Sequence, residues 1–259
     1  MLQFFQDILQ HREFLREHVL QALRSKYRGS VLGFAWTLLN PLMICLAFAF
    51  IFAAVNNTNL EAFLPYFLAG YLPWTFFVTS ATGATLSILG NASYVNRQYV
   101  PKGIFPLSLV LVNFVDLLAG LVSFFLVVTL VFPSRLHAAA LFLPISLAIL
   151  LVFVVGVAFL FATINVFFRD FNFLWGSISF VWFFVVPILF MPQNTPAALR
   201  GLNQFNVMYP MVRLFQDPLA FGVIPPLDII GLAMAYAAIL LVAGSAVFFR
   251  WQREFYMYV

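Results

Sequence analysis

Charged residues are scarce in this chain, because Asp, Glu, Lys and Arg make up only 8% of its 259 residues. A soluble domain usually carries about 25% of these residue types, and a fold of this size needs them to cover its surface. The single cysteine, Cys45, excludes an intrachain disulfide. The composition therefore excludes a water-soluble enzyme, a disulfide-rich scaffold and a disordered chain.

Motifs for catalysis are also missing. The sequence contains neither the G-x-x-x-x-G-K-[ST] loop that holds nucleotide phosphates nor the H-E-x-x-H zinc motif. Its three histidines, His11, His18 and His137, lie outside the long apolar runs, so they cannot activate Gly176-Ser177 or Gly244-Ser245. We interpret both Gly-Ser pairs as helix-packing positions. We expect no enzyme activity, no metal site and no cofactor bound by the chain itself.

Hydrophobic residues, by contrast, make up 64% of the chain, and 34 of them are phenylalanine. A membrane-spanning helix needs about 20 consecutive apolar residues. Continuous apolar runs favour helices over barrel strands, whose side chains alternate. We predict an all-α membrane protein with six transmembrane helices, at approximately 31–55, 63–90, 107–132, 140–166, 173–191 and 229–249.

The basic residues predict the orientation. With both termini in the cytoplasm, ten of the thirteen Lys and Arg residues lie on the cytoplasmic side, as the positive-inside rule requires. Residues 1–28 are predicted to form an amphipathic helix at that interface, and 29–259 the transmembrane domain. The net charge of +4 thus reports orientation, and we expect no nucleic-acid partner.

The segment 192–228 has six prolines but few charges. Short helices that re-enter the outer leaflet fit this composition, and an interfacial loop folded over the bundle is the alternative.

Asp116 is the one charged residue in the six apolar runs, and Asn113 lies on the same helical face. We favour a hydrogen-bonded contact of this pair between helices or subunits. The alternative is a proton-coupled carrier in which Asp116 titrates.

Four motifs carry a family resemblance. Residues 26–42 read KYRGSVLGFAWTLLNPL, 95–106 read VNRQYVPKGIFP, 167–170 read FFRD, and Tyr209-Pro210 precedes 215–218, FQDP. The pattern resembles type-2 ABC exporter permeases, in the subfamily that moves lipid-linked polysaccharides such as O-antigen, capsule or teichoic acid. That family often has Asn-Pro and an Arg where this chain has Tyr209-Pro210 and Gln216.

The resemblance implies a bacterial inner-membrane permease that forms a homodimer and works with two copies of a separate ATPase. ATP and Mg²⁺ then bind to the partner subunit, and the lipid-linked polymer passes between the two permeases, surrounded by membrane lipids. A permease of the same fold for another lipid or a drug is the alternative.

Sugar rings have apolar faces, and aromatic stacking of about 0.5–1.5 kcal/mol per contact is weak enough for a polymer to slide. Residues four and three positions apart share a helical face. By the resemblance, the first and fifth spans line the channel. The candidate lining residues are Trp36, Asn40, Tyr71, Trp74, Trp175, Ser179 and Trp182. The alternative is that such aromatic residues merely follow the composition or the membrane interface.

The resemblance also assigns the two ends of the molecule. The loop 91–106 and the start of the first span are expected to contact the ATPase, through Arg28, Arg97, Gln98, Tyr99 and Lys102. The alternatives are that Arg28 contacts lipid phosphates on the inner face and that the loop is basic only because of the positive-inside rule. The outer segment supplies the gate candidates Tyr209, Pro210 and Phe215.

Overall fold

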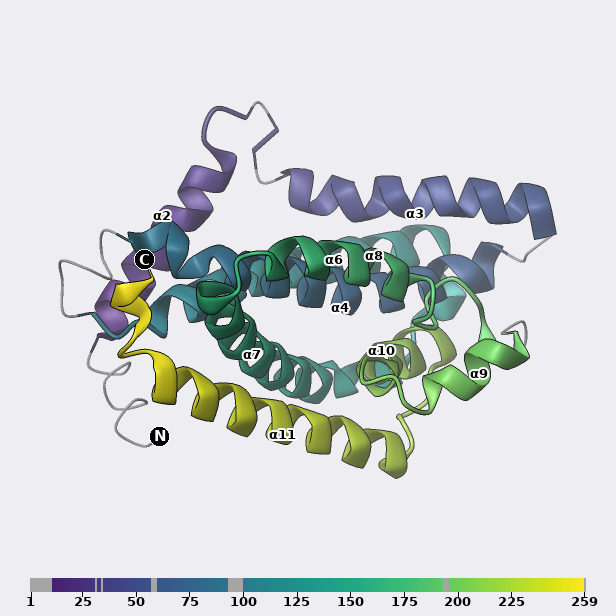
Figure 1. The fold of residues 1–259 in the computed structure, drawn as a ribbon. Helices are drawn as coiled ribbons and strands as arrows, with labels where there is room; N and C mark the ends of the chain where they lie inside the picture. Colours follow the sequence, from purple (N-terminus) through teal and green to yellow (C-terminus); the bar gives the residue numbers. More distant parts are fainter. Residues whose placement is uncertain are drawn as a thin grey trace.

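The structure, a computed structural model, describes residues 11–30, 32–33, 35–56, 60–92, 100–192 and 196–258. These residues form helices and connecting turns, with no β-strand among them. Most of the helices run along one common direction in a single bundle (Figure 1). The expected all-α architecture is therefore confirmed.

Four helices are long and apolar enough to cross a membrane in the part of the chain that the structure describes. These are α4 (Leu60–Ser87), α6 (Ile104–Val131), η3 (Ala138–Phe142) joined to α7 (Leu143–Phe167), and α11 (Leu227–Trp251). The other two expected spans fall on α3 (Ala35–Asn56) and α8 (Phe171–Phe183). The apolar stretches described there, Ala35–Phe48 and Phe171–Phe183, are shorter.

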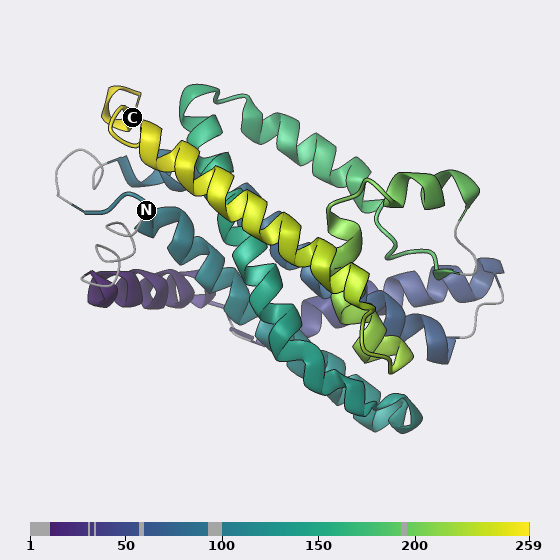
Figure 2. The same cartoon turned by 90° about the horizontal axis from the view of Figure 1, so that it is seen from below.

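The two ends of the bundle carry different short elements. Helix α2 (Arg12–Tyr27), 3₁₀ turn η1 (Leu89–Asn91) and C-terminal turn η6 (Phe255–Met257) lie at one end. Helices α9 (Ala197–Asn203) and α10 (Met208–Gln216) lie toward the opposite end (Figures 1 and 2). There, η2 (Pro133–Arg135) leads into η3, and the π-helical turn η5 (Asp217–Phe221) follows α10.

Helix α2 overlaps the amphipathic segment expected at 1–28 and docks on the start of α6. His18 stacks on Phe14 and meets Phe105 of α6 edge-on, with ring centroids 5.9 and 5.7 Å apart. Burial between these rings lowers the pKa of His18. An apolar contact thus fixes α2 to the bundle.

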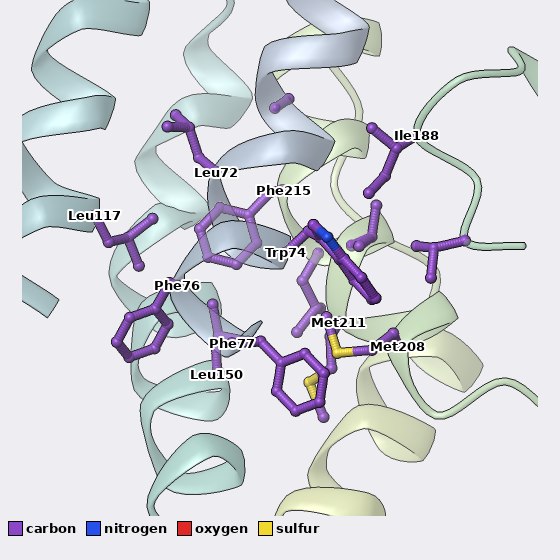
Figure 3. Packing of buried hydrophobic residues seen from close by; sticks show 14 of the residues in the cluster. Leu72, Trp74, Phe76, Phe77, Leu117, Leu150, Ile188, Met208, Met211 and Phe215 are labelled. Carbon is purple, nitrogen blue, oxygen red and sulfur yellow. The ribbon is translucent and has the colours of Figure 1, made fainter. Parts of the chain in front are cut away.

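The core gathers around α4, whose aromatic side chains are almost fully enclosed. Figure 3 shows Trp74 and Phe77 of α4 together with Met208 and Met211 of α10. Met208, Met211 and Phe215 are 0% exposed, so α10 is an internal element of the bundle.

Helices α7 and α11 make the closest crossing. The Cα atoms of Gly156 and Gly244 face the partner helix so closely that a Cβ on either would clash with backbone atoms. Gly244-Ser245 is therefore a helix-packing position, as predicted. Gly176-Ser177, by contrast, lies on an exposed face of α8, with open space beside Gly176.

This crossing predicts that Gly244→Ala lowers the free energy of unfolding by about 1–3 kcal/mol, because the methyl group overpacks a backbone contact. Gly231→Ala on the same helix is the matched control, since nothing lies within 4 Å of its position. Thermal unfolding of the purified protein in detergent measures both changes. Equal melting temperatures for the two variants would contradict the crossing.

Candidate functional site

The residues predicted to line a passage divide into two neighbouring surfaces and a buried cluster. The first surface is a crevice of about 280 Å³ between α3, α4 and α6. Trp36 and Asn40 line it from α3 and Tyr71 from α4. Trp36 is 51% exposed, so its ring is accessible along much of its surface.

The second surface is an apolar groove of about 490 Å³ between α3, α4 and α8. Tyr71 lines both surfaces and thus joins them. Trp74 and Ser179 contribute to the groove, together with Phe48 and Phe183. Three of the seven predicted lining residues therefore lie at the crevice and three at the groove, with Tyr71 in common.

The remaining two candidates, Trp175 and Trp182, belong to an aromatic cluster within the helix bundle. Trp175 and Trp182 both meet Phe77 edge-on, at 5.6 and 5.7 Å between ring centroids. Trp175 is only 3% exposed, and its indole N–H donates to Thr82 Oγ1 at 3.0 Å.

The lining role of Trp175 stays a prediction, and within the single chain its side chain is buried. Its position on one face with Ser179 and Trp182 holds, but that face packs against α4 in this structure. Trp74, 5% exposed, is similarly enclosed. Periodicity predicted that Trp175, Ser179 and Trp182 share one face of α8. Which face of α8 is buried follows only from the fold.

Asp116 pairs with a basic residue that lies outside the six apolar runs. Its Oδ2 accepts from Lys26 Nζ, at the end of α2, in an ion pair that is partly exposed to the crevice. Asn113 Nδ2 donates to Ser80 Oγ of α4 at 3.3 Å. The two residues thus contact two different elements, whereas we expected one shared contact.

Of the residues expected to contact an ATPase, Arg97, Gln98 and Tyr99 lie outside the described residues. Arg28 is exposed just after α2. Lys102 instead turns to its own chain, donating from Nζ to the carbonyl oxygen of Gln252 at 2.7 Å.

The C-terminal turn is held by a second loop residue, Arg169. Arg169 donates to the carbonyl oxygen of Tyr258 at 2.9 Å, while Lys102 also lies over the ring of Phe255. Burial here lowers the pKa of Lys102. Lys102 and Arg169 thus connect two loops to one tail.

At the other end, two side chains hold the irregular backbone after α8. Tyr66 Oη and Gln216 Nε2 donate to the carbonyl oxygen of Pro187 at 2.7 and 2.8 Å. Tyr66 also donates to the carbonyl oxygen of Phe190. Gly70 leaves the space for the Gln216 amide, which a Cβ would meet at 2.6 Å.

One of the gate candidates, Tyr209, contacts an ion pair. Arg213 Nε and Nη2 donate to the two carboxylate oxygens of Asp217 at 2.7 and 2.9 Å, and Nη1 donates to Tyr209 Oη. Asp217 is 1% exposed. Pro210 and Phe215 are buried in the core, so of the three candidates only Tyr209 is partly exposed.

Neutral amides form a network that the sequence analysis missed. Asn165 Nδ2 donates to the backbone of Thr85, whose Oγ1 donates to Asn172 Oδ1. Asn206 Oδ1 accepts from Trp182 Nε1 at 3.0 Å. The sequence did contain a signal for these contacts, because amide side chains lie within or beside its apolar runs. An amide group in a membrane rarely lacks a hydrogen-bond partner. No group of three His, Cys, Asp or Glu side chains able to hold a metal occurs in the described ranges.

The chain matches the family model described as ABC-2 type transporter over residues 16–219. It is 28% identical over 258 residues to the O-antigen export system permease protein RfbA of Myxococcus xanthus, with 98% of each chain covered. RfbA of Klebsiella pneumoniae is 25% identical over 234 residues, 90% of each chain. The capsule polysaccharide export inner-membrane protein CtrC of Neisseria meningitidis is 22% identical over 213 residues, covering 81% of this chain and 78% of that protein.

The buried ion pair of the outer segment yields a test. Arg213→Met leaves the Asp217 carboxylate without its partner, so we expect the unfolding free energy to fall by about 3–5 kcal/mol. The double variant Arg213→Met/Asp217→Leu removes the stranded charge and regains most of that loss. Thermal unfolding in detergent measures both, and a double variant no more stable than the single one would contradict the pairing.

Proposed function

Because the chain belongs to the ABC-2 type transporter family, we propose that it is the membrane-spanning permease of an ATP-driven exporter of lipid-linked polysaccharide. The observation that carries the proposal is the end-to-end similarity to an O-antigen export permease, which covers 98% of both chains. The cargo we propose is an O-antigen-like polymer attached to a lipid.

In this proposal the chain crosses the inner membrane six times. Helix α3, with 22 residues, is about 33 Å long, which is enough for a hydrocarbon core of about 30 Å. Helix α8 has 13 residues, and the buried segment after it extends its path toward the outer face. Segments α9, α10 and η5 then form the re-entrant structure. Tyr66 and Gln216 satisfy a carbonyl group of the irregular segment that leads into it, that of Pro187.

The termini are placed in the cytoplasm. Helix α2 and the C-terminal turn lie at the same end of the bundle, which agrees with the clustering of basic residues there. This end receives the separate ATPase, which binds ATP and Mg²⁺, while the permease itself is no enzyme. The family and the missing nucleotide loop in this chain support a motor on another polypeptide.

Two copies of the chain form the transport path. Helices α3 and α8 expose large apolar side chains, with Phe50 and Phe180 exposed by 78% and 70%. The crevice and the groove both lie along α3, so the proposed channel runs where α3 and α8 of one copy face the other. Weak aromatic contacts along this path suit a polymer that must slide.

Deleting the gene in the source organism tests the function. We expect surface polysaccharide to disappear and lipid-linked polymer to accumulate on the cytoplasmic side, because synthesis continues without export. Complementation with the wild-type gene is the control. Normal surface polysaccharide in the deletion strain would overturn the assignment, and loss of a different lipid or of drug resistance would favour a permease for that cargo.

The coupling role predicts a second result. Arg97→Ala removes a cation from the loop proposed to contact the ATPase, so we expect less ATPase to co-purify and several-fold less surface polymer. Arg135→Ala is the matched control, because Arg135 lies in η2 at the opposite end of the bundle. Normal co-purification and normal surface polymer in Arg97→Ala would remove the loop from the coupling path.

A further inference from the structure

We propose that the crevice between α3, α4 and α6 is a binding site for one pyranose ring of a carbohydrate. The inference rests on the proposed function and adds a defined recognition site to it. The crevice volume of about 280 Å³ lies at the lower limit of small-molecule sites, which span about 300–1,000 Å³. That size suits a single ring.

Two aromatic rings line the crevice. Trp36 contributes from the start of α3, and Tyr71 contributes from α4. Tyr71 is itself held by a stacked contact with Phe67 at 5.5 Å between centroids. A pyranose presents flat faces of C–H groups, and a fixed aromatic surface binds such a face without fixed charge.

Polar side chains line the same crevice. They are Asn40 of α3, Thr75 and Thr79 of α4, and Asn113 and Asp116 of α6. Sugar hydroxyls both donate and accept, amides and threonine hydroxyls do the same, and an ionised carboxylate accepts only. Aromatic rings together with amides, hydroxyls and a carboxylate are the combination that suits a hydroxyl-rich ring.

Lys26 lowers the energetic cost of having the Asp116 carboxylate next to the membrane. The ion pair with Asp116 balances the charge, and both side chains keep partial exposure, at 41% and 23%. Asp116 Oδ2 accepts from Lys26 Nζ, and both residues line the crevice. Because Lys26 belongs to the end of α2, the ligand meets a helix that is docked at the cytoplasmic end.

The polar groups are also held in place. Asn113 donates to Ser80, and Thr79 donates to the carbonyl oxygen of Thr75 at 2.8 Å. These bonds fix the amide and the hydroxyl before a ligand arrives, which lowers the entropic cost of binding.

Saturation-transfer-difference NMR on the purified protein in phosphatidylcholine nanodiscs tests the site. The probes are the methyl glycosides of glucose, galactose, mannose and N-acetylglucosamine, with sorbitol as the acyclic polyol. Maltoside detergent is avoided because its sugar head would compete. We expect transfer to at least one glycoside and none to sorbitol, since stacking needs a ring.

Two variants assign that signal to the crevice. Asp116→Asn should weaken binding about tenfold, because it removes charge-assisted hydrogen bonds. Trp36→Ala should weaken it about fivefold and Trp36→Phe should restore it, because a ring is again available for stacking. The matched controls, Asp228→Asn in the exposed first turn of α11 and Trp251→Ala at its far end, should bind as the wild type does.

The outcomes separate this site from the proposed function. No transfer to any glycoside, equal transfer to sorbitol, or equal losses in the control variants would overturn the crevice site even if the deletion strain lost its surface polymer. The converse result is glycoside binding that depends on Asp116 and Trp36 while the deletion strain keeps normal surface polymer. That pair of results would support the binding site and overturn the proposed export function.

Discussion

Gln216 and Tyr66 donate to the same backbone oxygen, that of Pro187, and these two bonds hold the irregular segment after α8. Peptide groups without partners are costly in a bilayer, so an irregular segment persists there only when side chains satisfy it. The donors belong to α4 and α10, and the acceptor follows α8. One carbonyl group therefore joins the helix at the centre of the core, the outer segment and the helix that carries the aromatic cluster.

Few charged side chains take part in the contacts described above. Lys26–Asp116 attaches α2 to α6, and Arg213–Asp217 stabilises the last turn of α10. Between these ends, neutral donors such as Asn165 and Trp175 connect α4, α7 and α8. Neutral hydrogen bonds avoid the large desolvation penalty of an unpaired ion, so α4, α7 and α8 are joined without fixed charge. The ions in the other contacts are paired, Lys26 with Asp116 at the crevice and Arg213 with Asp217 beside the core.

The sequence predicted the helices more readily than the contacts between them. Long apolar runs indicated the four described helices that are long and apolar enough to cross a membrane, and Gly244-Ser245 indicated a close helix contact, because both signals are local. The partner of Asp116 was missed because Lys26 lies 90 residues earlier, in another helix. The burial of Trp175 against α4 was not predicted for a different reason. When nearly every face of a helix is apolar, periodicity groups residues on a face but cannot tell which face is covered.

The tail held by Lys102 and Arg169 has a consequence for biosynthesis. Its two acceptor carbonyls belong to Gln252 and Tyr258, far along the chain from both donors. The loops that precede α6 and α8 are translated long before residues 252–258, which anchor them. Both loops are therefore fastened only once α11 and the turn after it have been synthesised, and a stop codon directly after Trp251 would yield a polypeptide with these helices but with both loops unfastened.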